Sequence, residues 1–113
     1  MRNPISVVSK WLCSLGEPPR SPHWPRVRAQ WLAHHPTCAA CGGTLNIEVH
    51  HKKPFHLFPA LELDPKNFLT LCEPMGIEHH LKVGHTIGGK SSWKIYNVNV
   101  VADAATILSS EKT

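Results

Sequence analysis

The sequence predicts a small α+β domain, and three observations lead to this prediction. Apolar residues recur at helical spacing over residues 22–34. Apolar residues alternate with polar ones over 45–50, and the apolar run FLTLC follows at 68–72, as is typical of two short strands. Between the helix and the strands, Cys38 and Cys41 in the string CAACGG have the two-residue gap of a zinc knuckle.

The size and composition of the chain favour one domain that needs a metal for its stability. Ten prolines and seven glycines interrupt the apolar runs of the 113 residues, so a large uninterrupted core cannot form. A bound metal compensates for a missing core in such small domains. We expect a flexible arm over 1–20 and a single domain over 21–113, with its core at 38–85.

The predicted helix has a start signal and one apolar stripe. Ser21 offers its hydroxyl as N-cap, and Pro22 fits the first helical position. The stripe consists of Trp24, Val27, Trp31 and Leu32. A single stripe predicts that the tryptophans pack in the core and do not stack on nucleobases.

The first strand is predicted to end at a pair of histidines, His50 and His51. Its apolar positions are Leu45, Ile47 and Val49. Because neighbouring side chains on a regular strand point to opposite faces, both histidines cannot reach one metal in ideal geometry. Either one binds the metal while the other holds water, or the strand twists before Pro54.

The rest of the chain is predicted in less detail. The three prolines of residues 52–66 predict a loop with one short helical turn, and a helix of one or two turns is expected over 78–83. Beyond Gly88 a loop is expected. For residues 93–110 both strand and helix remain open, since Tyr96, Val98 and Val100 suggest an extended segment whereas ADAATIL suggests a helix. Trp93 and Tyr96 are expected to form a packed cover.

The formal charge of +4 suits a polyanionic partner without identifying one. No apolar run reaches the roughly 20 residues of a membrane span, and the first residues lack a convincing leader, so a cytoplasmic protein without a membrane partner is expected. In that compartment, two close cysteines among nine histidines favour metal over disulfide. Cys13 is interpreted as a free thiol.

A structural zinc site is predicted from the cysteines. Cys38, Cys41 and Cys72 supply three thiolates, and His79 is the candidate fourth ligand of a tetrahedral Zn²⁺. The histidines at 48–51 and 79–85 suggest either a second structural zinc or a hydrolytic metal centre. The hydrolytic interpretation is favoured because the first site leaves four histidines without a structural role, namely His50, His51, His80 and His85.

Four blocks of the sequence resemble the HNH endonucleases. These are CAACGG, LNIEVHHKKPF, LDPKNFLTLC and HHLKVGH, which occur in the family's order over residues 38–85. The continuation GHTIGG…SSW…YNVNVVADA resembles phage and bacterial members. The resemblance implies a ββα-metal (His-Me finger) domain that hydrolyses DNA phosphodiester bonds, by nicking or by double-strand cleavage, with little sequence specificity of its own.

The resemblance also implies roles for individual residues. His51 matches the general base, and His50 matches a metal ligand at a position where many relatives have aspartate. Asn67 matches the middle residue of the motif, which braces the active-site loop, although some relatives use it on the metal. His80 and His85 match the terminal histidines that complete the catalytic metal site.

The same resemblance implies the cofactors and partners. The catalytic ion would be Mg²⁺, Mn²⁺, Ni²⁺ or Zn²⁺, and imidazole ligands favour the transition metals over Mg²⁺. The products would carry 5′-phosphate and 3′-hydroxyl ends. DNA is the expected partner, with phage packaging proteins as a further suggestion. Lys52, Lys53 and Lys82 are candidate phosphate contacts, and a solvated surface is an equal alternative for each.

The sequence departs from the family pattern in two places. Met75 stands where the fourth zinc-binding cysteine is usual, so His79 and His80 could exchange roles. The gap from His80 to His85 exceeds one helical turn, so Gly84 is expected to end the helix and let His85 turn inward. The alternative function is a noncatalytic zinc module that binds DNA or protein. Such a module would keep the cysteines but could dispense with His51.

Overall fold

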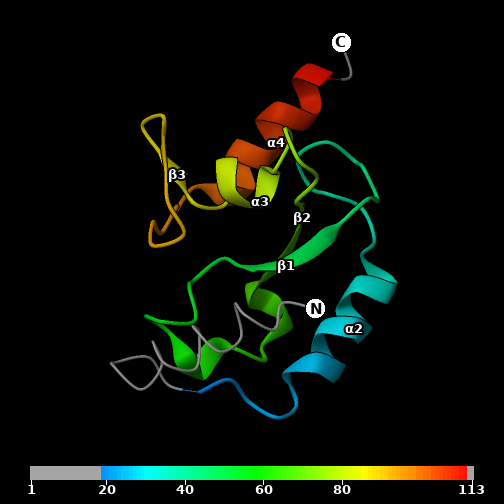
Figure 1. Ribbon diagram of the computed structural model, residues 1–113, viewed down its shortest axis with the longest axis vertical. Helices are drawn as coiled ribbons and strands as arrows, with labels where there is room; N and C mark the ends of the chain where they lie inside the picture. The colour runs from blue at the N-terminus through cyan, green and yellow to red at the C-terminus, as the bar shows by residue number, and fades with distance from the viewer. Residues whose placement is uncertain (1–18, 112–113) are drawn as a thin grey trace.

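The computed structural model describes residues 19–111 and has the expected α+β architecture, with two small antiparallel sheets (Figure 1). The elements are α2 (Trp24–His34), β1 (Ile47–His51), the 3₁₀ turns η1 (Pro59–Leu61) and η2 (Pro65–Asn67), β2 (Phe68–Cys72), α3 (His79–Lys82), β3 (Thr86–Ile87), β4 (Lys90–Ser91) and α4 (Val100–Glu111). Cys13 and the predicted arm up to residue 18 lie outside the described residues.

The pair β1 and β2 lies at the centre of the fold. The two strands are antiparallel, and their register pairs Ile47 with Cys72 and His51 with Phe68. Helix α2 packs against β1, whereas α3 packs against β2 on the side where α4 also lies (Figure 1). The strand pair therefore presents the end of β1, with its two histidines, between these layers.

Helix α2 begins later than the sequence predicted. The hydroxyl of Ser21 accepts a hydrogen bond from the backbone N–H of His23 at 3.1 Å, so it closes a turn that precedes the helix. The first turn of the helix contains Pro25, and no side chain caps it. The apolar stripe faces the strands, since the rings of Trp24 and Trp31 meet the ring of Phe68 at centroid distances of 5.6 and 5.4 Å. The stripe is only half-buried, however, and lies outside the core cluster, so the prediction that the tryptophans are core residues is met only in part.

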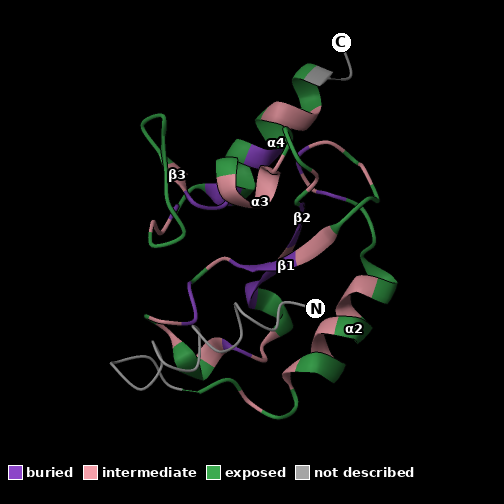
Figure 2. Ribbon diagram, in the orientation of Figure 1, coloured by how far each residue is buried: buried purple, intermediate pink, exposed green. Residues whose placement is uncertain are grey.

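Strand β1 is shorter than predicted and does not alternate. Leu45 is 67% exposed and lies outside the strand. Asn46, with a φ of 50°, turns the chain just before the strand begins. Val49, His50 and His51 are all buried, because layers on both sides cover this end of the strand (Figure 2). This end of the strand is therefore covered on both faces, whereas the alternating pattern is typical of a strand that is buried on one face only.

Two further predictions are corrected after β1. The loop over 52–66 leads through two 3₁₀ turns instead of one helical turn. Beyond α3, β3 and β4 form a hairpin instead of a loop, and Gly88 and Gly89 adopt positive φ angles of 61° and 80° at its turn. Glycine adopts this conformation without steric cost.

The open question about the C-terminal segment is settled in favour of a helix. Val100 and Ala104, one turn apart on α4, are buried in the core, and Ile107 packs against it. This core also contains residues of the turn at 38–43, called the cysteine turn below, of β2 and of the end of α3. They are Cys38, Ala40, Leu71, Cys72 and Val83. Two of the predicted metal ligands are thus core residues. None of the helices within residues 19–111 has the length and apolar character to cross a bilayer.

Candidate functional site

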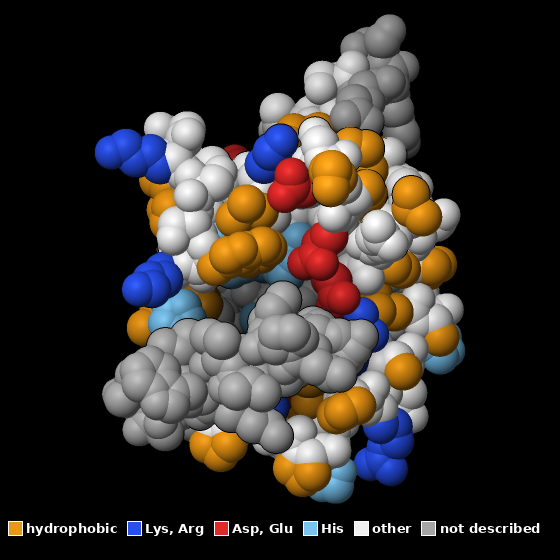
Figure 3. Space-filling model, in the orientation of Figure 1, with side chains coloured by type: hydrophobic (Ala, Val, Ile, Leu, Met, Phe, Trp, Pro, Cys, Tyr) orange, Lys and Arg blue, Asp and Glu red, His pale blue; other side chains and the backbone are white. Residues whose placement is uncertain are grey.

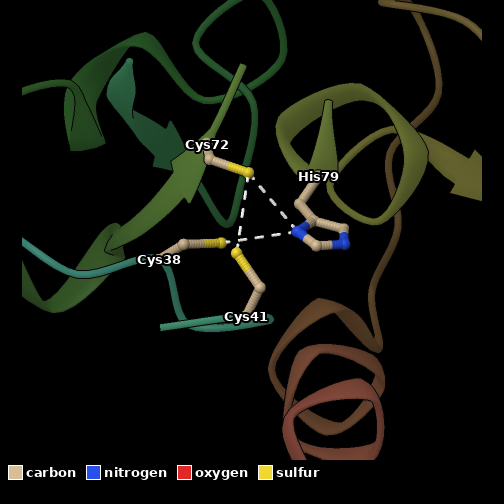
Figure 4. Close-up of side chains that lie close together, drawn as sticks. All are labelled: Cys38, Cys41, Cys72 and His79. Atoms are coloured by element: carbon tan, nitrogen blue, oxygen red, sulfur yellow. Dashed lines mark hydrogen bonds between the residues drawn. The ribbon is translucent and has the colours of Figure 1, made fainter. Parts of the chain in front are cut away.

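The first cluster consists of the three cysteines and the histidine predicted to bind zinc, Cys38, Cys41, Cys72 and His79. Their ligand atoms all lie within 4.8 Å of one another, and the side chains converge on one point (Figure 4). His79 Nδ1 lies 3.4 Å from the sulfur of Cys72 and 3.7 Å from that of Cys38. The sulfurs of Cys41 and Cys72 lie 3.9 Å apart, which is too far for a disulfide.

These distances match the edges of a zinc tetrahedron. Zn–S and Zn–N bonds of about 2.3 and 2.0 Å place two sulfur ligands about 3.8 Å apart and a sulfur and a nitrogen about 3.5 Å apart. The cluster is therefore positioned to bind a metal such as zinc. Of the two adjacent histidines that could have completed the site, His79 is the one that does so.

The local sequence explains why the first two cysteines converge. The N–H of Cys38 donates to the carbonyl of Gly43, and the N–H of Gly42 donates to the carbonyl of Cys38, both at 2.8 Å. Gly42 has a φ of 74°, a conformation that disfavours other residues. The N–H of Ala39 donates to the carbonyl of Thr70 at 2.8 Å and so fixes this turn beside β2.

Burial favours neutral thiols at this cluster unless a cation is bound. It raises the pKa of the Cys72 thiol to about 12 and also raises the pKa of Cys41. Several thiolates gathered in a core need a positive charge among them, and a bound divalent ion supplies it. The donor set of three sulfurs and one imidazole nitrogen fits zinc.

The second cluster consists of His50, His80 and His85, whose ligand nitrogens also lie within 4.8 Å of one another. The end of β1 supplies the first histidine, α3 the second and the segment after α3 the third. The ring of His50 meets those of His80 and His85 at centroid distances of 5.2 and 4.8 Å. The structure thus brings together the three residues that the resemblance assigns to a catalytic metal.

Hydrogen bonds orient two of these imidazoles. His80 Nδ1 donates to the Glu73 carboxylate at 2.7 Å, and His85 Nδ1 donates to the carbonyl of Ile95 at 2.9 Å. In both rings Nε2 is then the nitrogen left with a lone pair for a metal, in the arrangement common around metal-bound histidines. Neither ring nitrogen of His50 has a hydrogen-bond partner among the described residues, although this side chain is only 2% exposed. A metal ion would satisfy one of them.

Gly84 makes this packing possible, although not in the way the sequence predicted. Helix α3 ends just before Gly84, with Lys82 as its last residue and Val83 as its C-cap, but Gly84 does not adopt the positive φ of a typical helix-ending glycine. A Cβ on Gly84 would lie 2.5 Å from the carbonyl oxygen of His80 and 2.8 Å from His50 Nδ1. Only the absence of a side chain at this position lets the backbone pass so close to His50, and His85 follows directly.

His51 is held separately from the three-histidine cluster. Its Nε2 donates to the backbone carbonyl of Glu62 at 2.9 Å, and its ring packs against Trp24 at a centroid distance of 4.7 Å. A carbonyl oxygen only accepts, so Nε2 carries the proton and Nδ1 keeps its lone pair. Burial lowers the pKa of His51 to about 4 and that of His50 to about 2, so both rings are neutral at pH 7.

His51, His80 and His85 line one cleft, with a volume of about 220 Å³. Its other lining residues are Arg20, Val49, Pro54, Phe55, His56 and Trp93. Histidine side chains reach the surface near the middle of the face in Figure 3, between hydrophobic and acidic side chains. None of the described residues that line the cleft carries a carboxylate.

Asn67 fastens the loop between the two strands. Its side-chain oxygen accepts from the N–H of Lys53 at 2.7 Å, and its amide donates to the carbonyls of Lys53 and Leu61 at 3.0 and 3.4 Å. Leu61 directly precedes Glu62, whose carbonyl binds His51. The side chain of Asn67 therefore contacts loop backbone and is absent from both metal-ligand clusters.

The three lysines predicted to contact DNA do not line the histidine cleft. The ammonium of Lys53 lies over the ring of Phe58 at 5.5 Å, and that of Lys82 donates to the carbonyl of Gly76 at 3.4 Å. Lys52 is half-buried at the strand end. In Figure 3 the Lys and Arg side chains are scattered over the face and form no single patch among the described residues.

The structure adds residues that sequence reasoning missed. Arg20 and Trp93 line the cleft, while the carboxylate of Glu73 and the backbone of Glu62 orient histidines. Trp93 is 53% exposed and meets the rings of His80 and His85 at 5.0 and 5.1 Å, so the predicted packed cover is wrong for this residue. No local sequence pattern marks any of these roles.

Comparisons with protein-family models, with curated proteins and with solved structures find no match. What the protein can do must therefore be argued from its own chemistry. That chemistry consists of a thiolate-rich cluster in the core, a second cluster of three imidazoles, and a fourth imidazole that lines the same cleft as two of these three.

Proposed function

We propose that the protein is a metal-dependent endonuclease of the HNH type, which hydrolyses phosphodiester bonds of DNA. The observation that carries this proposal is the shared cleft, since His51 lines it together with His80 and His85. A base and a metal centre must reach the same phosphate in this chemistry. The order of elements, with β1 and β2 paired and α3 following, also supports a ββα-metal arrangement.

His51 is the general base in this proposal. The carbonyl of Glu62 holds the proton on Nε2, so the lone pair on Nδ1 accepts a proton from water. Packing against Trp24 fixes the ring plane, and Asn67 fastens the loop that carries the orienting carbonyl. The base is thus positioned by two direct contacts, and by a fastened loop, none of which involves the metal ligands.

The second cluster would hold the catalytic ion through one nitrogen each of His50, His80 and His85. Three imidazoles leave coordination positions open for a substrate oxygen and suit Zn²⁺, Ni²⁺ or Mn²⁺ better than Mg²⁺. When bound, such an ion offsets the negative charge that develops on the phosphate during hydrolysis. The thiolate cluster has a different duty, which is to hold the cysteine turn, β2 and α3 together.

The reaction balances with these groups. Water attacks phosphorus, its proton passes to Nδ1 of His51, and the bond from phosphorus to the 3′-oxygen breaks. The departing 3′-oxygen takes a proton from solvent, and the products are a 3′-hydroxyl and a 5′-phosphate. The formal charge of +4 favours an anionic polymer as the substrate.

A plasmid-nicking assay tests the proposal. The zinc-containing protein should convert supercoiled plasmid to nicked circles when Mn²⁺ or Ni²⁺ is added. His51→Ala should lower the rate by about 10²- to 10⁴-fold, the usual contribution of a general base. His34→Ala is the matched control, because His34 is exposed at the end of α2 and does not line the cleft.

Two results would contradict the proposal. The first is full cleavage by His51→Ala, which would remove the base. The second is an absence of cleavage by wild-type protein whose two metal sites are shown to be occupied, which would favour a noncatalytic zinc module that binds DNA or protein.

A further inference from the structure

Arg20 stands beside the proposed base at the edge of the cleft. Its guanidinium lies over the ring of Phe55 at 4.2 Å and over that of Trp24 at 5.3 Å. Trp24 also packs against His51 at a centroid distance of 4.7 Å. The arginine and the proposed base thus share one aromatic neighbour, which fixes where each lies relative to the other.

Glu62 links the same two residues a second time. Its carboxylate accepts from the N–H of Ser21 at 3.1 and 3.2 Å and lies 3.6 Å from Nη1 of Arg20, while its backbone carbonyl accepts from His51. The Glu62 side chain is 7% exposed, whereas that of Arg20 is 46% exposed. The arginine is therefore anchored at a buried carboxylate and still reaches the solvent of the cleft.

The charge of the cleft calls for an anion. Its described lining residues include Arg20 but no carboxylate. Glu62 pairs with Arg20 and Glu73 with His80 from outside the lining, so a divalent ion on the three imidazoles would still leave a net positive charge there. A phosphodiester monoanion neutralises part of this charge. A guanidinium carries five N–H donors in a planar fork that matches phosphate geometry well.

From these contacts we infer that Arg20 binds the phosphate on which His51 and the three-histidine cluster act, and that Glu62 positions both Arg20 and His51. This inference rests on the proposed nuclease function and identifies a residue of this chain that binds the substrate phosphate. The residue lies in the segment expected from the sequence to be a flexible arm, and none of the three lysines expected to contact DNA lines the cleft.

Binding to uncleaved DNA tests the inference without any need for turnover. The probe is a fluorescein-labelled duplex, titrated in Mn²⁺ with proteins that all carry His51→Ala, and anisotropy gives the affinity at several salt concentrations. Arg20→Gln should weaken binding roughly 10-fold, as expected for a lost charged hydrogen bond, and reduce the salt slope by about one. Arg20→Lys should keep the salt slope, because it keeps the charge.

Arg28→Gln is the matched control. Arg28 also pairs with a glutamate, since its Nη2 lies 2.7 Å from Glu48, but it does not line the cleft. The change in net charge is the same as in Arg20→Gln, and the affinity for the duplex should fall less than about 2-fold because no close phosphate contact is lost. Circular dichroism of each variant checks that it is folded.

The outcomes separate this inference from the proposed function. If Arg20→Gln binds the duplex as tightly as Arg28→Gln, the inference is wrong even when wild-type protein cleaves plasmid. If Arg20→Gln weakens binding as expected and wild-type protein does not cleave, the arginine contact stands and the nuclease proposal fails. If Arg20→Gln does not fold, an unchanged affinity and an unchanged salt slope in Arg20→Ala or Arg20→Met would overturn the inference.

Discussion

His79 and His80 are adjacent in the sequence, yet their imidazoles belong to two different metal-ligand clusters. Nδ1 of His79 lies 3.4 Å from the sulfur of Cys72, whereas the ring of His80 meets that of His50 at a centroid distance of 5.2 Å. Consecutive residues of a helix project about 100° apart, so one turn of α3 serves both clusters. A metal bound by the thiolates therefore also fixes the helix that carries a ligand of the second site.

Glu73→Gln should weaken the second metal site and leave the zinc in place. The carboxylate of Glu73 accepts from His80 Nδ1 at 2.7 Å, and losing such a partner usually lowers metal affinity about 10- to 100-fold. Ni²⁺ titration can be followed by quenching of the fluorescence of Trp93, whose ring lies 5.0 Å from that of His80. Trp93→Phe identifies this component of the signal.

Glu78→Gln is the control for this measurement. Glu78 precedes α3, and its side chain accepts from the N–H of Gly76 at 3.4 Å, away from the histidine cluster. The Ni²⁺ affinity of this variant should equal that of wild type. An unchanged Ni²⁺ affinity in Glu73→Gln would mean that the second cluster does not bind metal through His80.

Gly84→Ala should damage the second site through packing alone. The new Cβ would lie 2.5 Å from the carbonyl oxygen of His80 and 2.8 Å from His50 Nδ1, so the two histidines must separate. We expect a loss of about 1–3 kcal/mol in the free energy of unfolding, together with weaker Ni²⁺ binding. Urea unfolding of the zinc-loaded protein gives the first quantity and the fluorescence titration the second.

Gly76→Ala separates backbone strain from this clash. Gly76 has a φ of 87°, and a Cβ added there would meet no described atom within 4 Å, so alanine should cost about 1 kcal/mol through strain without touching a ligand. Its Ni²⁺ affinity should stay at the wild-type value. Equal Ni²⁺ affinities in the two alanine variants would refute the role given to Gly84.

Cys38→Ser should remove the tightly held zinc and with it most of the folded structure. Cys38 is 2% exposed in the core, and structural zinc contributes an apparent ~10–16 kcal/mol in small domains, as much as the whole stability of many proteins. Elemental analysis after dialysis should find about one zinc less per chain than in wild type, and circular dichroism should show a loss of helix. Ala39→Ser, in the same turn, should retain both. A folded, zinc-free Cys38→Ser protein would show that the thiolate cluster is not a structural metal site.

The sequence predicted the local elements of the fold well, but it misplaced some of their boundaries and their burial. The two strands, the short helix at 79–82 and the thiolate ligands follow from patterns within a few residues. The start of α2 was misplaced because Ser21 closes a separate turn, and the alternation of β1 failed because both faces of its end are covered. Pro25 could have indicated the later start, because proline is favoured in the first turn of a helix.

The sequence predicted the ligands that follow each other at typical spacings. It did not predict contacts between residues that lie far apart in the chain. Adjacent histidines gave no means of choosing between His79 and His80, because only the approach of α3 to β2 decides which one meets the sulfurs. The role of Glu62 could not be predicted either, because its backbone carbonyl, which any residue could supply, binds His51. Arg20 reaches the cleft through contacts with Phe55 and Glu62, more than 30 positions away in the chain.

The central claim is that the cleft itself hydrolyses a phosphodiester with His51 as base, independently of contacts to a DNA groove. A small substrate, thymidine 5′-(p-nitrophenyl phosphate), tests it most directly by release of p-nitrophenolate from protein with verified metal occupancy. Wild type should turn this diester over, and His51→Ala should be slower by about 10²- to 10⁴-fold with an unchanged Ni²⁺ affinity. Equal rates for wild type and His51→Ala, or no turnover by fully loaded wild type, would contradict the account.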